Sequence, residues 1–154
     1  MEYVEAPDKK KSKNLTFVEL LADDKDEENL ILHRGPKTFI IMNRFPYNAG
    51  HLMVLPNRKV ADLEDLTVSE RMEMLEQVIH GKQILTSAIK PGGFNVGINI
   101  GEAGGAGIPG HLHMHIVPRW EGDTNFMPVL GETRVLPTSL ESLYERLKPF
   151  VRGL

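Results

Sequence analysis

Three histidines alternate with apolar residues in His111-Leu112-His113-Met114-His115, and this run limits how the surrounding chain can fold. In a β-strand, successive side chains point to opposite faces of the sheet. An extended run would therefore place the three imidazoles on one face, with Leu112, Met114 and Ile116 on the other. We predict a strand over residues 111–117 that packs its apolar side chains on a core and turns its histidines toward a cleft.

Composition sets the wider limits. The chain has 154 residues, of which 41% are hydrophobic and 25% charged, as in one ordinary globular domain. A net charge of -3 gives no domain-wide positive field, so we expect no nucleic-acid partner. No apolar run approaches the roughly 20 residues that span a bilayer, so we expect a cytoplasmic protein with no membrane partner. The absence of cysteine excludes disulfides, and any metal site would have to use His, Asp or Glu.

Hydrophobic patterns predict four further strands and two helices, which together make an α+β domain. The strands are expected over residues 29–33, 38–42, 50–55 and 94–100, the first three as an antiparallel meander. The capping box Thr67-Val68-Ser69-Glu70 opens one long helix, and Pro91-Gly92-Gly93 ends it. Its core stripe is Met74, Val78, Gly81, Leu85 and Ala88.

Within that stripe, Gly81 would let the helix approach a sheet closely. His80 lies beside the stripe and is interpreted as a surface or boundary residue. The same capping pattern recurs at residues 138–141, where Leu140, Leu143, Tyr144 and Leu147 predict a short terminal helix.

The remaining segments have weaker patterns. Residues 1–14 are polar and lysine-rich, which predicts a flexible arm, and residues 15–154 are expected to form a single domain that includes the C-terminal tail. Residues 17–21 fit either a strand or a short helix. Residues 23–28 are interpreted as an acidic loop.

A glycine-rich segment, residues 101–110, lies between the last two predicted strands and has five glycines in ten residues. Backbone amides in such a segment can approach an anion and form a nest for phosphate. The segment does not match a P-loop, and a strand rather than a helix follows it, which excludes the dinucleotide fingerprint. Because it directly precedes the three imidazoles, it favours a phosphate site.

The histidines alone allow two chemical interpretations. Zinc commonly takes three imidazoles as ligands. Alternatively, one neutral imidazole attacks phosphorus while its neighbours fix its tautomer and charge. The spacing does not decide between them.

Two motifs resemble the signatures of the histidine triad (HIT) family of nucleotide hydrolases and transferases. The first is the pattern of three alternating histidines after a glycine-rich loop, continued by Pro118-Arg119. The second is residues 43–56, which end in Gly-His, four residues and Pro. The resemblance spans roughly residues 15–120. The stretch from Arg119 to Phe126 is similar to the branch of diadenosine tetraphosphate phosphorylases and fragile-histidine-triad-like hydrolases.

The resemblance implies a HIT-like fold, in which a five-stranded antiparallel sheet carries one long and one short helix and two chains form a two-fold homodimer. It also implies a nucleotide hydrolase or nucleotidyltransferase that cleaves dinucleoside polyphosphates or related nucleoside phosphates through a nucleotidyl-histidine intermediate. The ligand would be a purine nucleotide or a dinucleoside polyphosphate. Two alternatives stay open: a nucleotide-binding regulatory module with little catalysis, and a three-histidine metal site.

Roles for the histidines follow from the resemblance. His113 matches the nucleophile that attacks the α-phosphate, and His115 matches the residue that contacts the scissile phosphate. His111 and His51 match supporting histidines that help set the tautomer of the nucleophile.

Nucleotide-binding roles follow in the same way. Asn43 matches a ribose ligand, Asn99 a phosphate contact, and Ile41 part of the base pocket. Gly105 and Gly107 belong to the loop whose amides would hold phosphate.

Two departures from the family pattern carry further expectations. Relatives often have Cys-x-x-Cys in a structural zinc site, where this chain has Leu15-Thr16-Phe17-Val18. We therefore predict no structural zinc, with apolar side chains filling the space, and no required cofactor; a divalent cation arriving with the substrate is left open. Residues 107–110 replace the Gln, Ser or Thr that often precedes the triad, so water and inorganic phosphate both stay open as acceptors.

Overall fold

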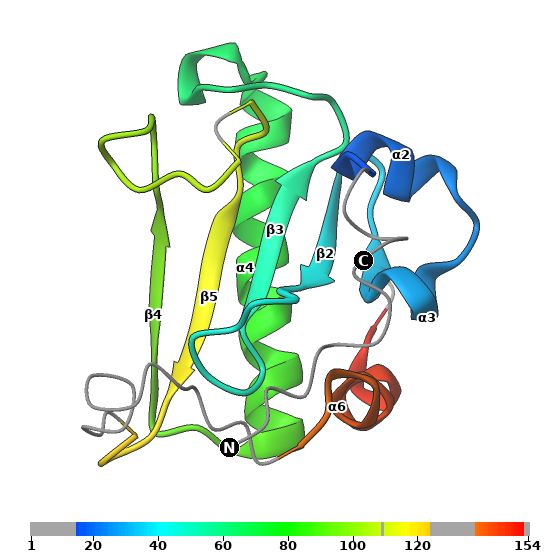
Figure 1. Cartoon of the computed structure of the whole chain (residues 1–154), viewed down its shortest axis with the longest axis vertical. Helices are drawn as coiled ribbons and strands as arrows, with labels where there is room; N and C mark the ends of the chain where they lie inside the picture. The colour runs from blue at the N-terminus through cyan, green and yellow to red at the C-terminus, as the bar shows by residue number, and fades with distance from the viewer. Residues whose placement is uncertain (1–14, 109, 124–137, 153–154) are drawn as a thin grey trace, which may run out of the picture.

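The computed structural model describes residues 15–108, 110–123 and 138–152. The predicted arm over residues 1–14, and residues 124–137 and 153–154 of the predicted C-terminal tail, lie outside these ranges. The described chain folds around one antiparallel sheet with the strand order β1-β2-β3-β5-β4, which confirms the five-stranded prediction (Figure 1). Its strands are β1 (Ile31–Arg34), β2 (Thr38–Met42), β3 (Leu52–Pro56), β4 (Gly93–Ile98) and β5 (Met114–Arg119).

Helix α4 (Val68–Ile89) lies behind the sheet and covers one face of it (Figure 1). It begins at the predicted capping box: Thr67 Oγ1 accepts from the Glu70 amide at 3.1 Å, and Glu70 Oε1 accepts from the Thr67 amide at 2.9 Å. It ends before Lys90, which adopts a left-handed φ of 48°. All members of the predicted stripe are buried: Met74, Val78, Gly81, Leu85 and Ala88.

The close approach predicted at Gly81 is also present. A Cβ atom built on Gly81 would lie 2.8 Å from Ile116 Cδ1, well inside van der Waals contact. The missing side chain therefore lets α4 sit directly against β5.

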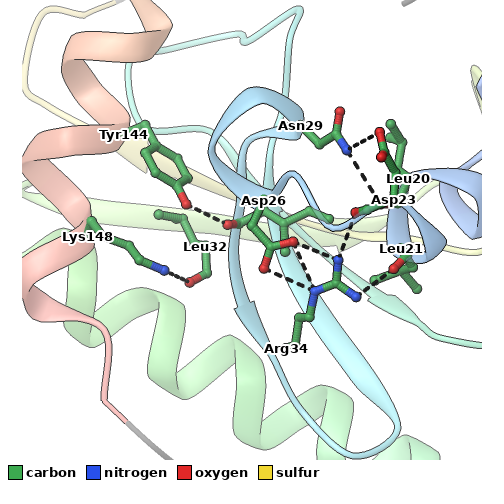
Figure 2. Close-up of polar contacts among 10 residues, drawn as sticks. Leu20, Leu21, Asp23, Asp26, Asn29, Leu32, Arg34, Tyr144 and Lys148 are labelled. Atoms are coloured by element: carbon green, nitrogen blue, oxygen red, sulfur yellow. Dashed lines mark hydrogen bonds and ion pairs between the residues drawn. The ribbon is translucent and has the colours of Figure 1, made fainter.

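Three short helices gather beside β1: α2 (Phe17–Ala22), α3 (Asp26–Asn29) and α6 (Leu140–Leu147) (Figure 1). Figure 2 shows hydrogen bonds and an ion pair that join these helices to β1. Tyr144 Oη donates to the Ile31 carbonyl at 2.9 Å, and Lys148 Nζ donates to the Leu32 carbonyl at 3.1 Å. Arg34 reaches back from β1 to the Asp26 carboxylate at 2.6 Å. Two 3-10 turns complete the described elements, η1 (Leu63–Asp65) and η2 (Lys148–Phe150).

The structure corrects several local predictions. For residues 17–21, where a strand and a short helix were both open, the structure has a helix, α2, which is capped by Thr16. The acidic loop expected over residues 23–28 instead contains the single turn α3, because Arg34 binds Asp26 and the left-handed Leu30 closes the turn. The terminal helix α6 is confirmed, but its cap is Ser139.

The prediction of a surface or boundary position for His80 is wrong. The side chain is 3% exposed, and its Nε2 accepts from the Arg152 amide at 3.0 Å. Its ring also packs edge-on against His33, with centroids 4.9 Å apart. The chain after α6 covers His80, a long-range contact that the helical pattern does not contain.

Within the described ranges, no helix combines the length and the apolar character needed to cross a membrane.

Candidate active site

The face of the sheet opposite α4 forms the floor of a cleft. Ile41 on β2 pairs with Met53 on β3, and Met53 pairs with His115 on β5. Directly opposed residues of antiparallel strands share a face, so these three side chains form a row. Ile116, the next residue, points the other way, toward α4.

This cleft has a volume of about 2180 Å³. It brings together nearly all the residues singled out from the sequence. Those that line it are Ile41, Asn43, Asn99, Gly105, Gly107, His111, His113 and His115. His51 is not part of the lining but lies directly behind it, 1% exposed and bonded to His115.

Strand β5 begins at Met114, three residues later than predicted. The Leu112 amide donates to the Val60 carbonyl at 2.7 Å, and the His111 carbonyl accepts from a side chain rather than from a neighbouring strand. His111 and His113 are therefore held by loop contacts. They still reach the cleft beside His115, where they are 2% and 7% exposed.

His113 has a defined tautomer. Its Nδ1 lies 2.8 Å from the His111 carbonyl oxygen. A carbonyl can only accept, so Nδ1 carries the proton and the neutral ring keeps its lone pair on Nε2. A lone pair on the ring nitrogen opposite the buried bond is what a nucleophilic imidazole requires.

His115 is the next imidazole along the cleft. Its Nδ1 lies 2.8 Å from His51 Nε2, and its ring meets the His113 ring edge-on with centroids 4.9 Å apart. Burial lowers the pKa of His115, and the neighbouring His113 lowers it further. The imidazole is therefore neutral at physiological pH and can act as a hydrogen-bond donor.

The His111 side chain does not contact His113 in the way that the family pattern implied. Its Nε2 donates to the Pro56 carbonyl at 2.8 Å. Burial is the main cause that lowers the pKa of His111, and the charges of His113 and Lys59 lower it further. The hydrogen bond to Pro56 acts in the opposite direction and raises it. The family pattern implied that the His111 and His51 side chains set the tautomer of His113. Here the main-chain carbonyl of His111 does so, and His51 bonds to His115.

The segment where relatives have Cys-x-x-Cys contributes an apolar ring. Phe17 on α2 packs edge-on against His111, with centroids 5.5 Å apart at 87°, and lies 6.2 Å from the His113 ring. The chain has no cysteine to supply thiolate ligands. Over the described residues, no group of three or more His, Cys, Asp or Glu side chains is arranged to hold a metal ion.

The glycine-rich loop differs from the predicted phosphate nest. The amides of Gly104, Gly105 and Ala106 donate to carbonyls of the loop itself. Gly105 has φ +87°, a conformation that favours glycine, and its carbonyl lies 3.5 Å from Asn99 Nδ2. Gly107 lines the cleft, and a Cβ atom built there would meet nothing within 4 Å. Open space is therefore present beside Gly107, whereas the amides of residues 104–106 are engaged within the loop.

The loop between β2 and β3 carries one residue that sequence reasoning missed. The Tyr47 ring stacks on His51, with centroids 5.0 Å apart at 25°, and the Tyr47 amide donates to His51 Nδ1 at 3.2 Å. Asn43 begins the same loop: its Oδ1 accepts from the Phe45 amide at 2.9 Å, and its Nδ2 lies 3.4 Å from His51 Nδ1. The available signal for Tyr47 is its place within the second motif, four residues before His51.

Comparison with known proteins identifies the family. The profile described as HIT domain matches residues 24–122. The chain belongs to the histidine triad (HIT) family. It is 44% identical over 115 residues to the AP-4-A phosphorylase of Mycobacterium tuberculosis, covering 75% of this chain and 59% of that protein. It is 32% identical over 93 residues to the asymmetrical bis(5'-nucleosyl)-tetraphosphatase of Schizosaccharomyces pombe, covering 60% and 50%.

Solved HIT structures have the same fold. The NitFhit protein of Caenorhabditis elegans aligns with a TM-score of 0.64 at 26% identity, covering 79% of this chain and 26% of that one. A Zn-bound HIT protein of Mycobacterium smegmatis aligns with a TM-score of 0.65 at 21% identity, covering 80% and 84%. This HIT chain spans about three fifths of the length of the mycobacterial phosphorylase that it matches.

Proposed function

We propose that this HIT protein cleaves dinucleoside polyphosphates through a covalent nucleotidyl-histidine on His113. The observation that carries the proposal is the bond from His113 Nδ1 to the His111 carbonyl, which leaves Nε2 as the free nitrogen beside the cleft. The Nε2 lone pair attacks the α-phosphorus, and the P–O bond to the rest of the polyphosphate breaks, with the electron pair leaving on oxygen. The proton stays on Nδ1, and its hydrogen bond to the His111 carbonyl stabilises the positive ring.

The acceptor in the second step is proposed to be inorganic phosphate. Its oxygen attacks the phosphorus of the intermediate, and the N–P bond returns its electrons to His113. The name of the relative that is 44% identical supports phosphate, and the open space beside Gly107 can admit a small anion.

Turnover of diadenosine tetraphosphate with and without phosphate tests the acceptor. Phosphorolysis gives ADP and ATP, and only when phosphate is present. AMP and ATP in phosphate-free buffer would instead assign water as the acceptor and leave the role of His113 intact.

Substitution of His113 tests the nucleophile. We expect His113→Ala to lose at least about 10³-fold in kcat, as removal of a nucleophile commonly does, while its urea midpoint stays close to that of the parent protein. Acid quenching should trap a nucleotidyl adduct on the parent protein and none on the variant. Tight mononucleotide binding with no adduct and no turnover would favour the regulatory module instead.

We also propose that two chains pair through the β4 edge. Val96 on this edge strand is 46% exposed, and Lys82 of α4 lies over the Phe94 ring of β4. The same side of α4 carries Met72, Leu75 and Ile79, which are 66%, 59% and 43% exposed. An open strand edge beside an apolar helical stripe is suited to a second copy.

Analytical ultracentrifugation tests this pairing. Val96→Asp should convert a dimer into a monomer, because it would place two charges in the contact. Val18→Asp, an equally exposed valine on α2, is the control and should leave the mass unchanged. A parent protein that sediments as a monomer at micromolar concentration would contradict the proposal.

We further propose that catalysis requires no resident metal or other cofactor, supported by the apolar Phe17 ring against His111. Activity should survive dialysis against a chelator once free Mg²⁺ is restored for the substrate. The proposed location is the cytoplasm, which cell fractionation would test.

A further inference from the structure

Three residues form a hydrogen-bonded chain that ends at the cleft. The Tyr47 amide lies 3.2 Å from His51 Nδ1, and His51 Nε2 lies 2.8 Å from His115 Nδ1. The second ring nitrogen of His115, Nε2, therefore lies on the side of the ring away from His51, and the ring lines the cleft.

The first donor in this chain fixes every later proton. A backbone amide can only donate, so His51 Nδ1 must be unprotonated and His51 must carry its proton on Nε2. That proton then points at His115 Nδ1, which must accept. The proton of neutral His115 is thereby placed on Nε2.

The opposite proton order would bring two hydrogens together. If His115 carried its proton on Nδ1, His51 would have to accept on Nε2 and hold its proton on Nδ1, facing the Tyr47 amide. Because His51 is 1% exposed, that arrangement would leave a buried donor without an acceptor, which is costly. Neutral His115 is favoured as well, since burial and His113 lower its pKa.

The Tyr47 ring holds the geometry. It stacks on the His51 ring at 25°, with centroids 5.0 Å apart, and lies 6.3 Å from the His115 ring. Asn43 Nδ2 lies 3.4 Å from the same His51 nitrogen and favours the same tautomer. The Tyr47 amide is the closer donor, at 3.2 Å, and the ring of the same residue orients His51.

We propose that Tyr47 is a positioning residue that acts through His51 to set the tautomer of His115, so that His115 presents Nε2–H to a phosphate oxygen in the cleft. Its catalytic consequence rests on the proposed function. The tautomer itself does not, since the contacts exist in the substrate-free protein.

Nitrogen NMR of histidine-labelled, substrate-free protein tests the proton order directly at pH 7.5. Long-range ¹H–¹⁵N correlations, assigned with His51→Gln and His115→Gln, should show both rings as single Nε2–H tautomers. A proton on Nδ1 of either ring would overturn the proposal, whatever the turnover.

Two variants separate the amide from the ring. Tyr47→Pro removes both the N–H and the ring and should give His51 a mixture of tautomers, with kcat reduced about 10- to 100-fold, since a histidine in the wrong tautomer is a poor catalyst. Tyr47→Leu removes the ring but keeps the N–H, and it should leave both histidines as single Nε2–H tautomers. An unaltered spectrum for folded Tyr47→Pro would contradict the role of the amide.

The wild-type spectrum keeps the test decisive if Tyr47→Pro does not fold. Predicted tautomers without turnover of diadenosine tetraphosphate would count against the proposed function alone. Turnover with the opposite tautomers would count against the role of Tyr47 alone.

Discussion

A single main-chain carbonyl, that of His111, decides which nitrogen of His113 can react. Because the acceptor belongs to the backbone, the tautomer of His113 does not depend on the chemistry of a neighbouring side chain. The imidazole of His111 makes separate contacts, since it donates to Pro56 and packs on Phe17. This division explains why His111 can be nearly fully buried while remaining next to the reactive ring.

The Phe17 contact gives a prediction at the same scale. Phe17→Ala should destabilise the fold by about 3 kcal/mol, as loss of a buried aromatic ring does. It should also raise the pKa of His111 toward 6.5, because burial is the main cause of its lowering. NMR titration and urea unfolding measure the two effects.

Val18→Ala is the matched control for Phe17→Ala, since Val18 is on the same helix and 41% exposed. It should change stability by no more than about 0.5 kcal/mol. If Phe17→Ala leaves the pKa of His111 where it is, the ring is not what keeps water from this imidazole.

At the scale of elements, the contact between α4 and β5 depends on a missing side chain. Gly81→Ala would gain about 1 kcal/mol of helix propensity but place its Cβ 2.8 Å from Ile116 Cδ1 in a filled core. Overpacking of this kind costs about 1–3 kcal/mol. We expect a net loss of about 1 kcal/mol in the free energy of unfolding.

Ile116→Val removes the clashing methyl group and supplies the test. In a double-mutant cycle followed by urea unfolding, Gly81→Ala should cost less in the Ile116→Val background than in the parent, by about 1 kcal/mol. Strict additivity would mean that the helix does not rest on Ile116 at this point.

How far the sequence predicted these elements depends on whether the determinants are local. The α4 cap at Thr67 and the strand β2 follow from neighbouring residues, and both are observed. The two family motifs also identified residues that meet in one cleft, although they lie far apart in the chain.

The failures come from contacts made across the fold. His80 is buried by a segment that follows it by about 70 residues. The His113 side chain takes the His111 carbonyl and delays the start of β5. The amides of residues 104–106 donate to carbonyls of the same loop instead of staying open to an anion. Neither the alternation of apolar and polar residues nor the amino-acid composition indicates which side chains or distant segments will bond to a given backbone group.

For the whole molecule, buried histidines predict how stability changes with pH. The pKa values of His33, His80, His111 and His115 are all lowered from 6.5, in each by burial first. As pH falls below 6.5, the unfolded chain binds protons that the folded protein does not. Stability is therefore highest above pH 6.5 and decreases below it.

Urea midpoints at pH 7.5, 6.5 and 5.5 measure this loss. Glu70 does not titrate in this pH range, because its bond to Arg58 lowers its pKa from 4.5 to about 2. The contribution of Glu70 to stability is therefore lost only at more acidic pH. His80→Asn should reduce the slope, because it removes one of the four groups. A midpoint that is flat or rises on acidification would contradict the prediction.

Strand β5 is the last of the described strands to be synthesised, yet it lies between β3 and β4 and joins β4 to the rest of the described sheet. In a nascent chain that ends before residue 114, β4 has no neighbouring strand, and the backbone groups along one edge of β3 have no hydrogen-bond partners. The same strand brings His115 to its partners. A product terminated before residue 114 is thus expected to be inert toward nucleotides and prone to self-association, so enzymatic competence requires synthesis to pass β5.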